Sequence, residues 1–493
     1  MAQQDWRSGL LVSLFLTISA FGQVTDPTLA GQDPPASLHI GTIQVHGLVR
    51  GRAEGWNWFY RGDRTVYGFG ESQLQISFSQ HRSRLDWKIA FEQPALYNLP
   101  ADALDNGIPL GLGGSYYAAN HAHQNTANLF VNQAFVRIGG IAGNNGRLQI
   151  GRFEFTEGWE GQEHDASLAW LKHERIAGRM IGNSYWTAVT RSLDGIRFSD
   201  DVSPHNSFDF VAARVSSGVY QTNGWNDLNV ALLYGAYARD LPLGQVVSQL
   251  RVFGIGYRDG RNTTKVDNRP LAARQADTQP ITIGTFGGDY IMVFPVRYLG
   301  KWDLLTWGAV QTGSWGLLDH HAGAATGEAG WHPRFKWLHP WLRAGALYAS
   351  SDGNADDGKH TTFFQMLPTD RQYARIPFYT LQNLEDYTGQ LILLPSPRLT
   401  LHSEVHKVKL HGKHDLWYQG SGAFQKDSFG YVGAPAAARG GLANFLDISA
   451  DYQATPRLRL TYYFGILSGK ATLTSDLRGQ KGGFTYFEFE YAF

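Results

Sequence analysis

The last nine residues alternate strictly in polarity, and this pattern constrains the fold more than any other feature. One face of the extended segment carries only aromatic residues, namely Phe487, Phe489, Tyr491 and Phe493. The opposite face carries Glu488 and Glu490. A soluble enzyme has little use for an apolar stripe at its end, whereas a closed membrane β-barrel meets lipid with one face and its own lumen with the other. The segment therefore predicts a strand of a bacterial outer-membrane barrel.

Similar period-2 stretches recur from residue 43 onwards without a long helical interruption. In the first, Ile43 to Ala53, apolar or small residues alternate with Gln44, His46, Arg50 and Arg52. Further stretches of this kind are Leu85 to Glu92, Leu228 to Ala236, Tyr290 to Tyr298, Leu399 to Lys407, Leu446 to Gln453 and Leu458 to Leu467. Clusters of Gly, Asn and Asp separate the stretches, as turns separate strands.

Composition supports an all-β membrane chain. The sequence has 57 glycines, 13% aromatic residues and only 17% charged residues. It has no cysteine, which excludes disulfides, thiol catalysis and thiolate metal sites. Its mean hydropathy is -0.28, and no apolar run approaches the ~18 residues of a helical membrane span. The formal net charge of +0 gives no overall field that would favour nucleic acid.

The length predicts one large antiparallel transmembrane β-barrel. At roughly 25 residues per strand with its loop, the mature chain would hold about 16 to 20 strands. A barrel of this size implies an aqueous passage. The long polar stretches 97–128, 259–288 and 350–386 are either extracellular loops or constrictions folded into the lumen, and the sequence leaves both open.

The N-terminus has the pattern of an export signal. Arg7 precedes the apolar stretch Leu10 to Phe21, and Ala20-Phe21-Gly22 places small residues where a signal peptidase acts. We expect a signal peptide at residues 1–22, a short periplasmic lead at 23–38 and a barrel domain at 39–493. A short buried helix at the N-terminus is the alternative.

Basic residues recur on the polar faces of the expected strands. The candidates for an electropositive lumen are Arg50, Arg52, Lys88, Arg152, Arg191, Arg197 and Arg343. Guanidinium groups along a water-filled passage would attract and pass an anionic chain. The alternative is that each pairs with a lumen carboxylate or is solvated at a rim.

Two further patterns contain possible metal ligands. His402, Glu404 and His406 share one strand face, a set that could bind zinc, but alternation along any lumen face gives the same spacing. Asp352, Asn354 and Asp356 alternate oxygens as calcium loops do, although an Asx turn is the default interpretation. We expect no cofactor and no resident metal. No hydrolase, P-loop or dinucleotide motif is present.

Several segments together resemble the alginate export family of outer-membrane barrels. Leu148 to Glu154 is similar to that family's strand with a Gly-Arg pair, and Arg191 to Arg197 to its following R-x-F-D-G-V-R stretch. Tyr348 to Phe363, with Leu367-Pro368-Thr369 after it, is similar to the family's strand-plus-loop element, and His406-Lys407 also fits. The sequence departs from the family pattern at Phe153, Ser351, Leu367 and Asp370-Arg371, which bears on the substrate more than on the fold.

The resemblance implies an 18-stranded barrel that lets an anionic, alginate-like polysaccharide or small anions pass, with no bond made or broken. By the family pattern, Arg152 would lie in the lumen with Arg191 and Arg197 near it, and Arg371, Arg375 and Lys407 would complete the basic constriction. The expected partners are the polyanion, outer-membrane lipid and periplasmic synthesis or export proteins, without nucleic acid. Two rival hypotheses remain: a barrel-embedded hydrolase or lipid- or polymer-modifying enzyme centred on His402, Glu404 and His406, and a nutrient-uptake porin.

Overall fold

The computed structural model describes residues 38–58, 66–105, 108–143, 145–161, 165–335, 337–369, 376–436, 438–476 and 481–493. The expected signal peptide at residues 1–22 lies outside this part of the chain, and so does all but the last residue of the expected lead at 23–38.

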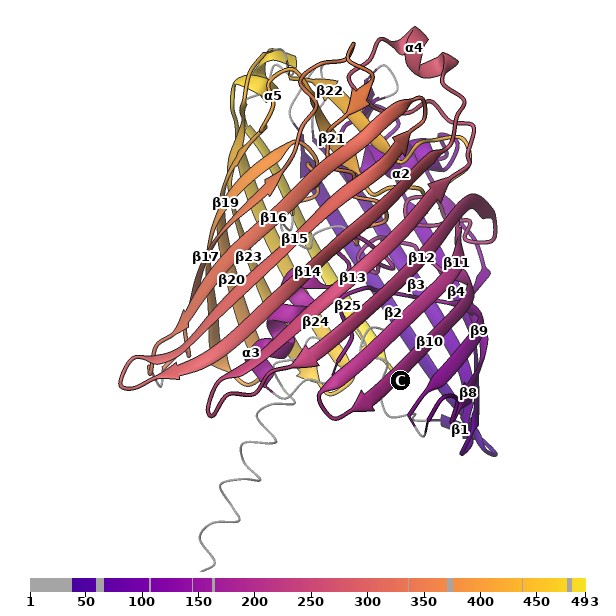
Figure 1. Ribbon diagram of the computed structural model, residues 1–493, viewed down its shortest axis with the longest axis vertical. Coiled ribbons are helices and arrows are strands. Elements are labelled where there is room, and N and C mark those ends of the chain that lie inside the picture. The colour runs from indigo at the N-terminus through magenta and orange to yellow at the C-terminus, as the bar shows by residue number, and fades with distance from the viewer. Residues whose placement is uncertain are drawn as a thin grey trace, which may run out of the picture.

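Eighteen long antiparallel strands form a closed barrel in the described part of the chain, as the resemblance implies (Figure 1). In order around the wall, they are β2 (Ile43–Asn57), β3 (Val66–His81), β4 (Leu85–Tyr97), β8 (Phe130–Gly139), β9 (Arg147–Phe153), β10 (Leu193–Ser203), β11 (Asn206–Ser216), β12 (Asp227–Asp240), β13 (Val247–Asp259), β14 (Ile281–Val296), β15 (Gly300–Trp315), β16 (Leu318–His332), β17 (Trp341–Ala349), β19 (Leu384–Ser396), β20 (Leu399–Lys409), β23 (Gly441–Thr455), β24 (Leu458–Gly469) and β25 (Lys481–Ala492). The barrel closes where β25 pairs with β2, from Leu48 opposite Ala492 to Asn57 opposite Gly483. Closure leaves no strand edge open to lipid.

Shorter elements lie at the rims and inside the barrel. The short strands are β1 (Leu38–Ile40), β5 (Leu104–Asp105), β6 (Ile108–Pro109), β7 (Thr126–Ala127), β18 (Lys359–His360), β21 (Leu416–Gly420) and β22 (Tyr431–Pro435). The helices are α2 (Leu112–Ala119), α3 (Ala166–Leu171), the π-helix η1 (Lys172–Ile176), α4 (Leu271–Ala276) and α5 (Ala471–Asp476). Among the described residues, no helix is both long and apolar enough to cross a bilayer.

The two faces of the wall follow the alternation in the sequence. On β25, the aromatic rings of Phe487, Phe489 and Tyr491 are exposed on the outside, whereas Glu488 points inward to Arg52. The last backbone hydrogen bonds join Gly47 and Phe493 in both directions, at 2.8 and 2.9 Å. The prediction from the terminal strand is therefore confirmed: apolar side chains face lipid and polar side chains face the lumen.

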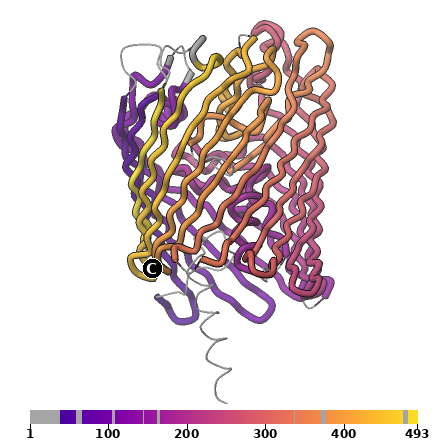
Figure 2. The backbone as a smooth tube through the Cα atoms, turned by 90° about the vertical axis from the view of Figure 1, so that its left-hand side faces the viewer, coloured from indigo at the N-terminus to yellow at the C-terminus, as the bar shows by residue number. Residues whose placement is uncertain are grey.

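The two ends of the barrel differ in the length of their connections (Figures 1 and 2). Short turns such as 204–205, 397–398 and 456–457 join strands at one end, where β25 also finishes. Long connections such as 98–129, 154–192 and 410–440 lie between strand ends at the other. In outer-membrane barrels the short turns are periplasmic and the long loops extracellular, which fixes the orientation.

The interior holds folded segments in addition to the polar inner wall. Phe363 and Phe364, from the connection 350–383, are almost wholly buried and pack edge-on against Trp307 and Tyr257 of the wall. Of the long polar stretches left open by the sequence, 350–386 thus contributes to an internal core. The size of the barrel by itself predicted a simple aqueous passage. The interior is instead partly filled, because burying these apolar side chains is more favourable than exposing them to water.

Candidate functional site

Residues 154–161 and 165–192 of the connection from β9 to β10 lie inside the barrel, and we call them the inner segment. Asp165 begins α3 by accepting hydrogen bonds from the backbone N–H groups of Ser167 and Leu168, at 2.8 and 3.2 Å. The other carboxylate oxygen of Asp165 lies 3.1 Å from Nζ of Lys301, near the periplasmic end of β15. The inner segment therefore runs from the extracellular end of β9 almost to the periplasmic side and back (Figure 1).

Arg175 on η1 joins the inner segment to two separate strands of the wall. Its Nε lies 3.0 Å from Oε2 of Glu328 on β16, and its Nη1 lies 3.3 Å from Oε1 of Glu404 on β20. Arg343 on β17 contacts the same Glu328 at 2.7 Å and Asp303 at 2.5 Å. Burial opposes the charge of Arg175, but Glu328 and Glu404 outweigh it and raise its pKa above the ordinary value. A π-helix, a rare element often found at functional sites, thus positions a charged contact inside the barrel.

A second anchor has the opposite polarity, because here the inner segment supplies the carboxylates. Nη1 of Arg251 on β13 lies 2.5 Å from Glu157 and 3.4 Å from Glu160, and its Nε lies 2.6 Å from Asp289 on β14. All four side chains are almost wholly buried. Removing Arg251 would take the shared cation away from three buried carboxylates, so this residue holds the start of the inner segment against the wall.

Arg50 and Arg52 both reach from β2 to the inner segment, but their charges are compensated differently. Arg52 is paired with Glu488 at 2.6 Å and Glu71 at 2.7 Å, and it donates to the carbonyl of Trp186 at 2.9 Å. Arg50 donates to the carbonyls of Tyr185 and Thr187, and its nearest recorded carboxylate contact is Glu488 at 4.0 Å. The guanidinium of Arg50 therefore keeps more of its positive potential inside the barrel.

Arg179 has no carboxylate at salt-bridge distance among the described residues, whereas Arg50 has one at 4.0 Å. Its guanidinium donates to the carbonyl of Arg175 and lies over the Trp307 ring, 4.9 Å from the ring centroid. Burial and the neighbouring Arg175 lower the pKa of Arg179 to about 10, so it stays protonated at neutral pH. The inner segment thus carries a positive charge held by a carbonyl and an aromatic face.

Arg191 fastens three internal segments together. Its Nη1 donates to the carbonyl oxygens of Gly182 and Leu367, each at 2.8 Å, and of Pro368 at 3.2 Å. Its Nη2 donates to the carbonyl of Ser421 at 2.8 Å. Because these carbonyls belong to the inner segment and to the connections 350–383 and 410–440, Arg191 fixes how the three pack inside the barrel.

The remaining inward-facing candidates are Arg197, Arg343 and Lys88. Arg197 lies 2.5 Å from Asp209 across the β10–β11 pair, and Arg343 bridges Asp303 and Glu328. Lys88 is half-buried on the inner face of β4. The sequence left open whether the inward-facing basic residues pair with carboxylates. Arg52, Arg197 and Arg343 do so.

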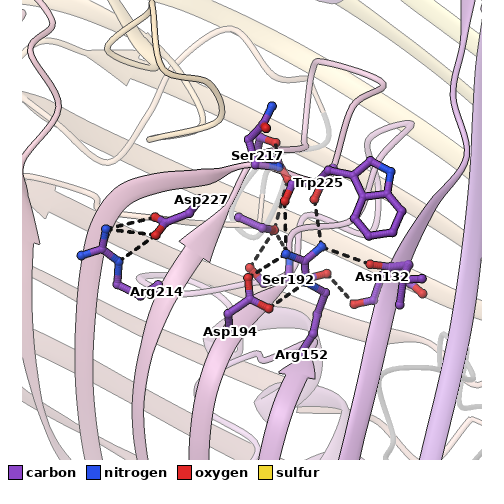
Figure 3. A network of polar contacts seen from close by, with 12 residues as sticks. Asn132, Arg152, Ser192, Asp194, Arg214, Ser217, Trp225 and Asp227 are labelled. Atoms are coloured by element: carbon purple, nitrogen blue, oxygen red, sulfur yellow. Dashed lines mark hydrogen bonds and ion pairs between the residues drawn. The ribbon is translucent and has the colours of Figure 1, made fainter.

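The placement expected for Arg152 was wrong. Arg152 shares a strand face with Ile150, whose side chain is exposed on the outside, and it pairs across to Asp194 with both oxygens at 2.7 Å (Figure 3). The neighbouring pair Arg214–Asp227, at 3.1 Å, continues this outer network. Arg152 also donates to the carbonyl of Trp225. The Gly-Arg strand therefore reinforces the extracellular end of the outer wall.

Lys407 also lies outside the lumen. On β20 it is exposed on the face of Val405, whereas His406 faces inward. The expected constriction residues Arg371 and Arg375 lie outside the described residues.

The two residue patterns considered above as alternatives to a metal-free protein have different contacts. In the first, Asp352 and Asn354 accept the backbone N–H groups of Asn354 and Asp356 at 3.0 and 3.2 Å, which is the geometry of Asx turns. In the second, His402 lies 3.7 Å from Asp451, away from the contact of His406 with Asp386 at 3.0 Å.

Sequence reasoning missed Arg175, Arg179 and Arg251. The first two lie in the inner segment, which has no strand periodicity that would indicate which way a side chain points. The sequence pattern does indicate that Arg251 faces inward, because this residue lies between Leu250 and Val252, which are both exposed on the outside.

Comparison with known proteins agrees with this architecture. The profile of the family described as Alginate export matches residues 71–468. No match was found among curated proteins. Similar solved structures include OccK9 (OpdG) of Pseudomonas aeruginosa, with a TM-score of 0.54 and 10% identity over 91% of this chain and 98% of that one. OccAB2 of Acinetobacter baumannii has a TM-score of 0.55 and 9% identity over 92% and 99%. OpdK of P. aeruginosa, solved with vanillate, has a TM-score of 0.53 and 9% identity over 91% and 98%.

These neighbours share the fold, while the profile covers most of the sequence. Together, the family match and the barrel fold support a transport role in the bacterial outer membrane. The chain therefore belongs to the alginate export family, as a β-barrel channel of the bacterial outer membrane.

Proposed function

We propose that the channel conducts an acidic polysaccharide, or smaller anions, passively through its lumen. The observation that carries this proposal is the incomplete compensation of two cations, Arg50 on the wall and Arg179 on the inner segment. A positive potential in an interior of low dielectric attracts anions more strongly than the same charge in water. Membership of the alginate export family supports an acidic sugar chain as the substrate.

The inner segment is the element that would control passage. Arg52, Arg175 and Arg251 hold it through ion pairs, and a polyanion can exchange its own carboxylates for those of the protein. Arg179 is fully buried in this conformation, so a polymer needs the inner segment to shift before it passes. Ions cross without any bond being broken, driven by their gradient.

Planar bilayer recording tests the proposal. We expect the wild-type channel to prefer anions and to be blocked by alginate oligomers more strongly than by neutral glucan oligomers. Arg50→Gln should reduce the anion preference several-fold. Arg152→Gln is the matched control, because Arg152 carries the same charge on the outer face and should leave selectivity unchanged.

A second candidate function is the uptake of small organic carboxylates. It is favoured by the occupied lumen and by the structural neighbour OpdK, which was solved with vanillate. A small carboxylate would need less displacement of the inner segment than a polymer. Block by vanillate without block by alginate oligomers would favour this candidate over polysaccharide transport.

A further inference from the structure

Two buried carboxylates lie directly opposite each other on the inner wall. Glu404 of β20 is the register partner of Asp447 of β23, and both side chains are nearly inaccessible to solvent. Like charges directly opposite on neighbouring strands destabilise a sheet, and burial increases the cost because water cannot screen them. Arg175 lies 3.3 Å from Glu404 and supplies part of the compensating positive charge.

His406, the next inward-facing residue of β20, is held so that one ring nitrogen points to the pair. Its Nδ1 lies 3.0 and 3.1 Å from the two oxygens of Asp386 on β19, and its ring stacks on Phe445 at 4.0 Å. A carboxylate on Nδ1 favours the tautomer whose proton is on that nitrogen, which leaves a lone pair on Nε2. Nε2 is fully buried, makes no hydrogen bond and lies 3.7 Å from Oε1 of Glu404.

We propose that Glu404, His406 and Asp447 form a site for a divalent transition-metal ion such as Zn²⁺. One ligand atom from each residue lies within 4.8 Å of the others. Tetrahedral zinc needs its ligands ~3.3 Å apart, so small side-chain rotations would close the site. A carboxylate that orients a ligating imidazole through its other nitrogen, as Asp386 does, is a regular feature of protein metal sites. The fourth position is left for water.

Arg175 links this site to the inner segment. Its Nη1 lies 3.3 Å from the same Oε1 of Glu404 that faces His406. A bound cation would compete with Arg175 for this oxygen, while Arg175 keeps its contact with Glu328 at 3.0 Å. The alternative to a metal is a protonated His406 that completes an ion network with Glu404 and Asp386. The two explanations differ in whether the protein retains a metal ion.

The test uses the full-length protein in detergent, treated with a chelator, loaded with Zn²⁺ and desalted. We expect the wild-type protein to retain one equivalent of zinc, measured by elemental analysis, with a zinc absorption edge that reports one imidazole among oxygen ligands. His406→Ala and Asp447→Asn should each weaken binding at least tenfold. His402→Ala is the matched control, because His402 lies on the same strand face but pairs with Asp451, and it should bind as the wild type does.

The shift in gel mobility on heating shows which variants retain a folded barrel. If His406→Ala fails to fold, the near-isosteric Asp447→Asn variant still tests the proposal. Failure of the wild type to retain zinc, or equal binding by folded wild type and Asp447→Asn, would overturn the proposal. Loss of zinc in His402→Ala with retention in Asp447→Asn would also overturn it.

Discussion

Arg152 of β9 lies directly opposite Asp194 of β10 on the outer face of the barrel, and its guanidinium holds both carboxylate oxygens at 2.7 Å. Residues of the two family-like motifs thus bind one another. We expect Arg152→Gln to lower the free energy of barrel unfolding by about 1 kcal/mol, since the pair is bidentate but partly exposed. Thermal unfolding followed by gel mobility measures this. Reversing both charges, as Arg152→Asp with Asp194→Arg, should recover part of the loss, and an unaffected single variant would contradict the structural role.

Gly151, the residue before Arg152, adopts a backbone conformation that favours glycine and lies close to the neighbouring strand. Gly151 has φ +131°, and an added Cβ would lie 2.2 Å from the carbonyl oxygen of Ala134 on β8. We expect Gly151→Ala to destabilise the barrel by about 2 kcal/mol through backbone strain and steric overlap. Gly235→Ala on β12 is the control, because an added Cβ there meets no atom within 4 Å. Equal unfolding temperatures for the two variants would show that the close approach at Gly151 relaxes without cost.

We expect the loss of the Arg191 side chain to loosen the packing of the internal segments while the barrel stays intact. Arg191→Ala removes the donor shared by carbonyls of three internal segments, and the cost of those buried hydrogen bonds is about 3 kcal/mol or more. We expect a larger and noisier single-channel conductance and faster amide exchange at residues 178–192, with β-sheet content unchanged by circular dichroism. Lys407→Gln, exposed on the outer face, should change neither property. Unchanged exchange in Arg191→Ala would mean that other contacts fix the inner segment.

We expect low pH to destabilise the packing around His360, because this side chain is buried in its neutral form. Its ring stacks on Trp315 at 4.1 Å, and its Nδ1 lies 2.9 Å from Nδ1 of His320. Burial, followed by His320 and Arg269, lowers the pKa of His360 well below its ordinary value. The neutral ring is therefore the stabilising form. Its contribution is complete above the ordinary pKa of about 6.5 and is lost as the pH falls below it.

Hydrogen exchange, corrected for intrinsic rates, checks this prediction. Protection of residues 359–369 should fall between pH 7 and pH 5, whereas the periplasmic turn 241–246 should not change. His360→Asn should reduce the pH dependence. A wild-type protein whose protection is constant over this range would contradict the prediction.

The sequence predicted the barrel because a period of two is visible in each strand separately. The faces of β2 and β25 follow directly from it, and so does the contact between Arg52 and Glu488 once the barrel closes. The same alternation places Arg152 on the face of Leu148 and Ile150, whereas the family pattern predicts that Arg152 lies in the lumen.

The contents of the lumen could not be predicted in this way. The inner segment has no regular period, and its position depends on contacts far apart in sequence, such as Arg175 with Glu404 and Arg191 with Ser421. The pairing of Glu404 with Asp447 depends on the register between β20 and β23, which alternation leaves undetermined.

The central claim is that the lumen is an anion-selective passage whose selectivity depends on the inward guanidinium of Arg50. Its most direct test is the reversal potential of the purified channel in a planar bilayer under a potassium chloride gradient. We expect a reversal potential with the sign of chloride selectivity for the wild type and for Arg152→Gln, and a clearly smaller one for Arg50→Gln. A cation-selective wild type, or equal reversal potentials for all three proteins, would contradict it.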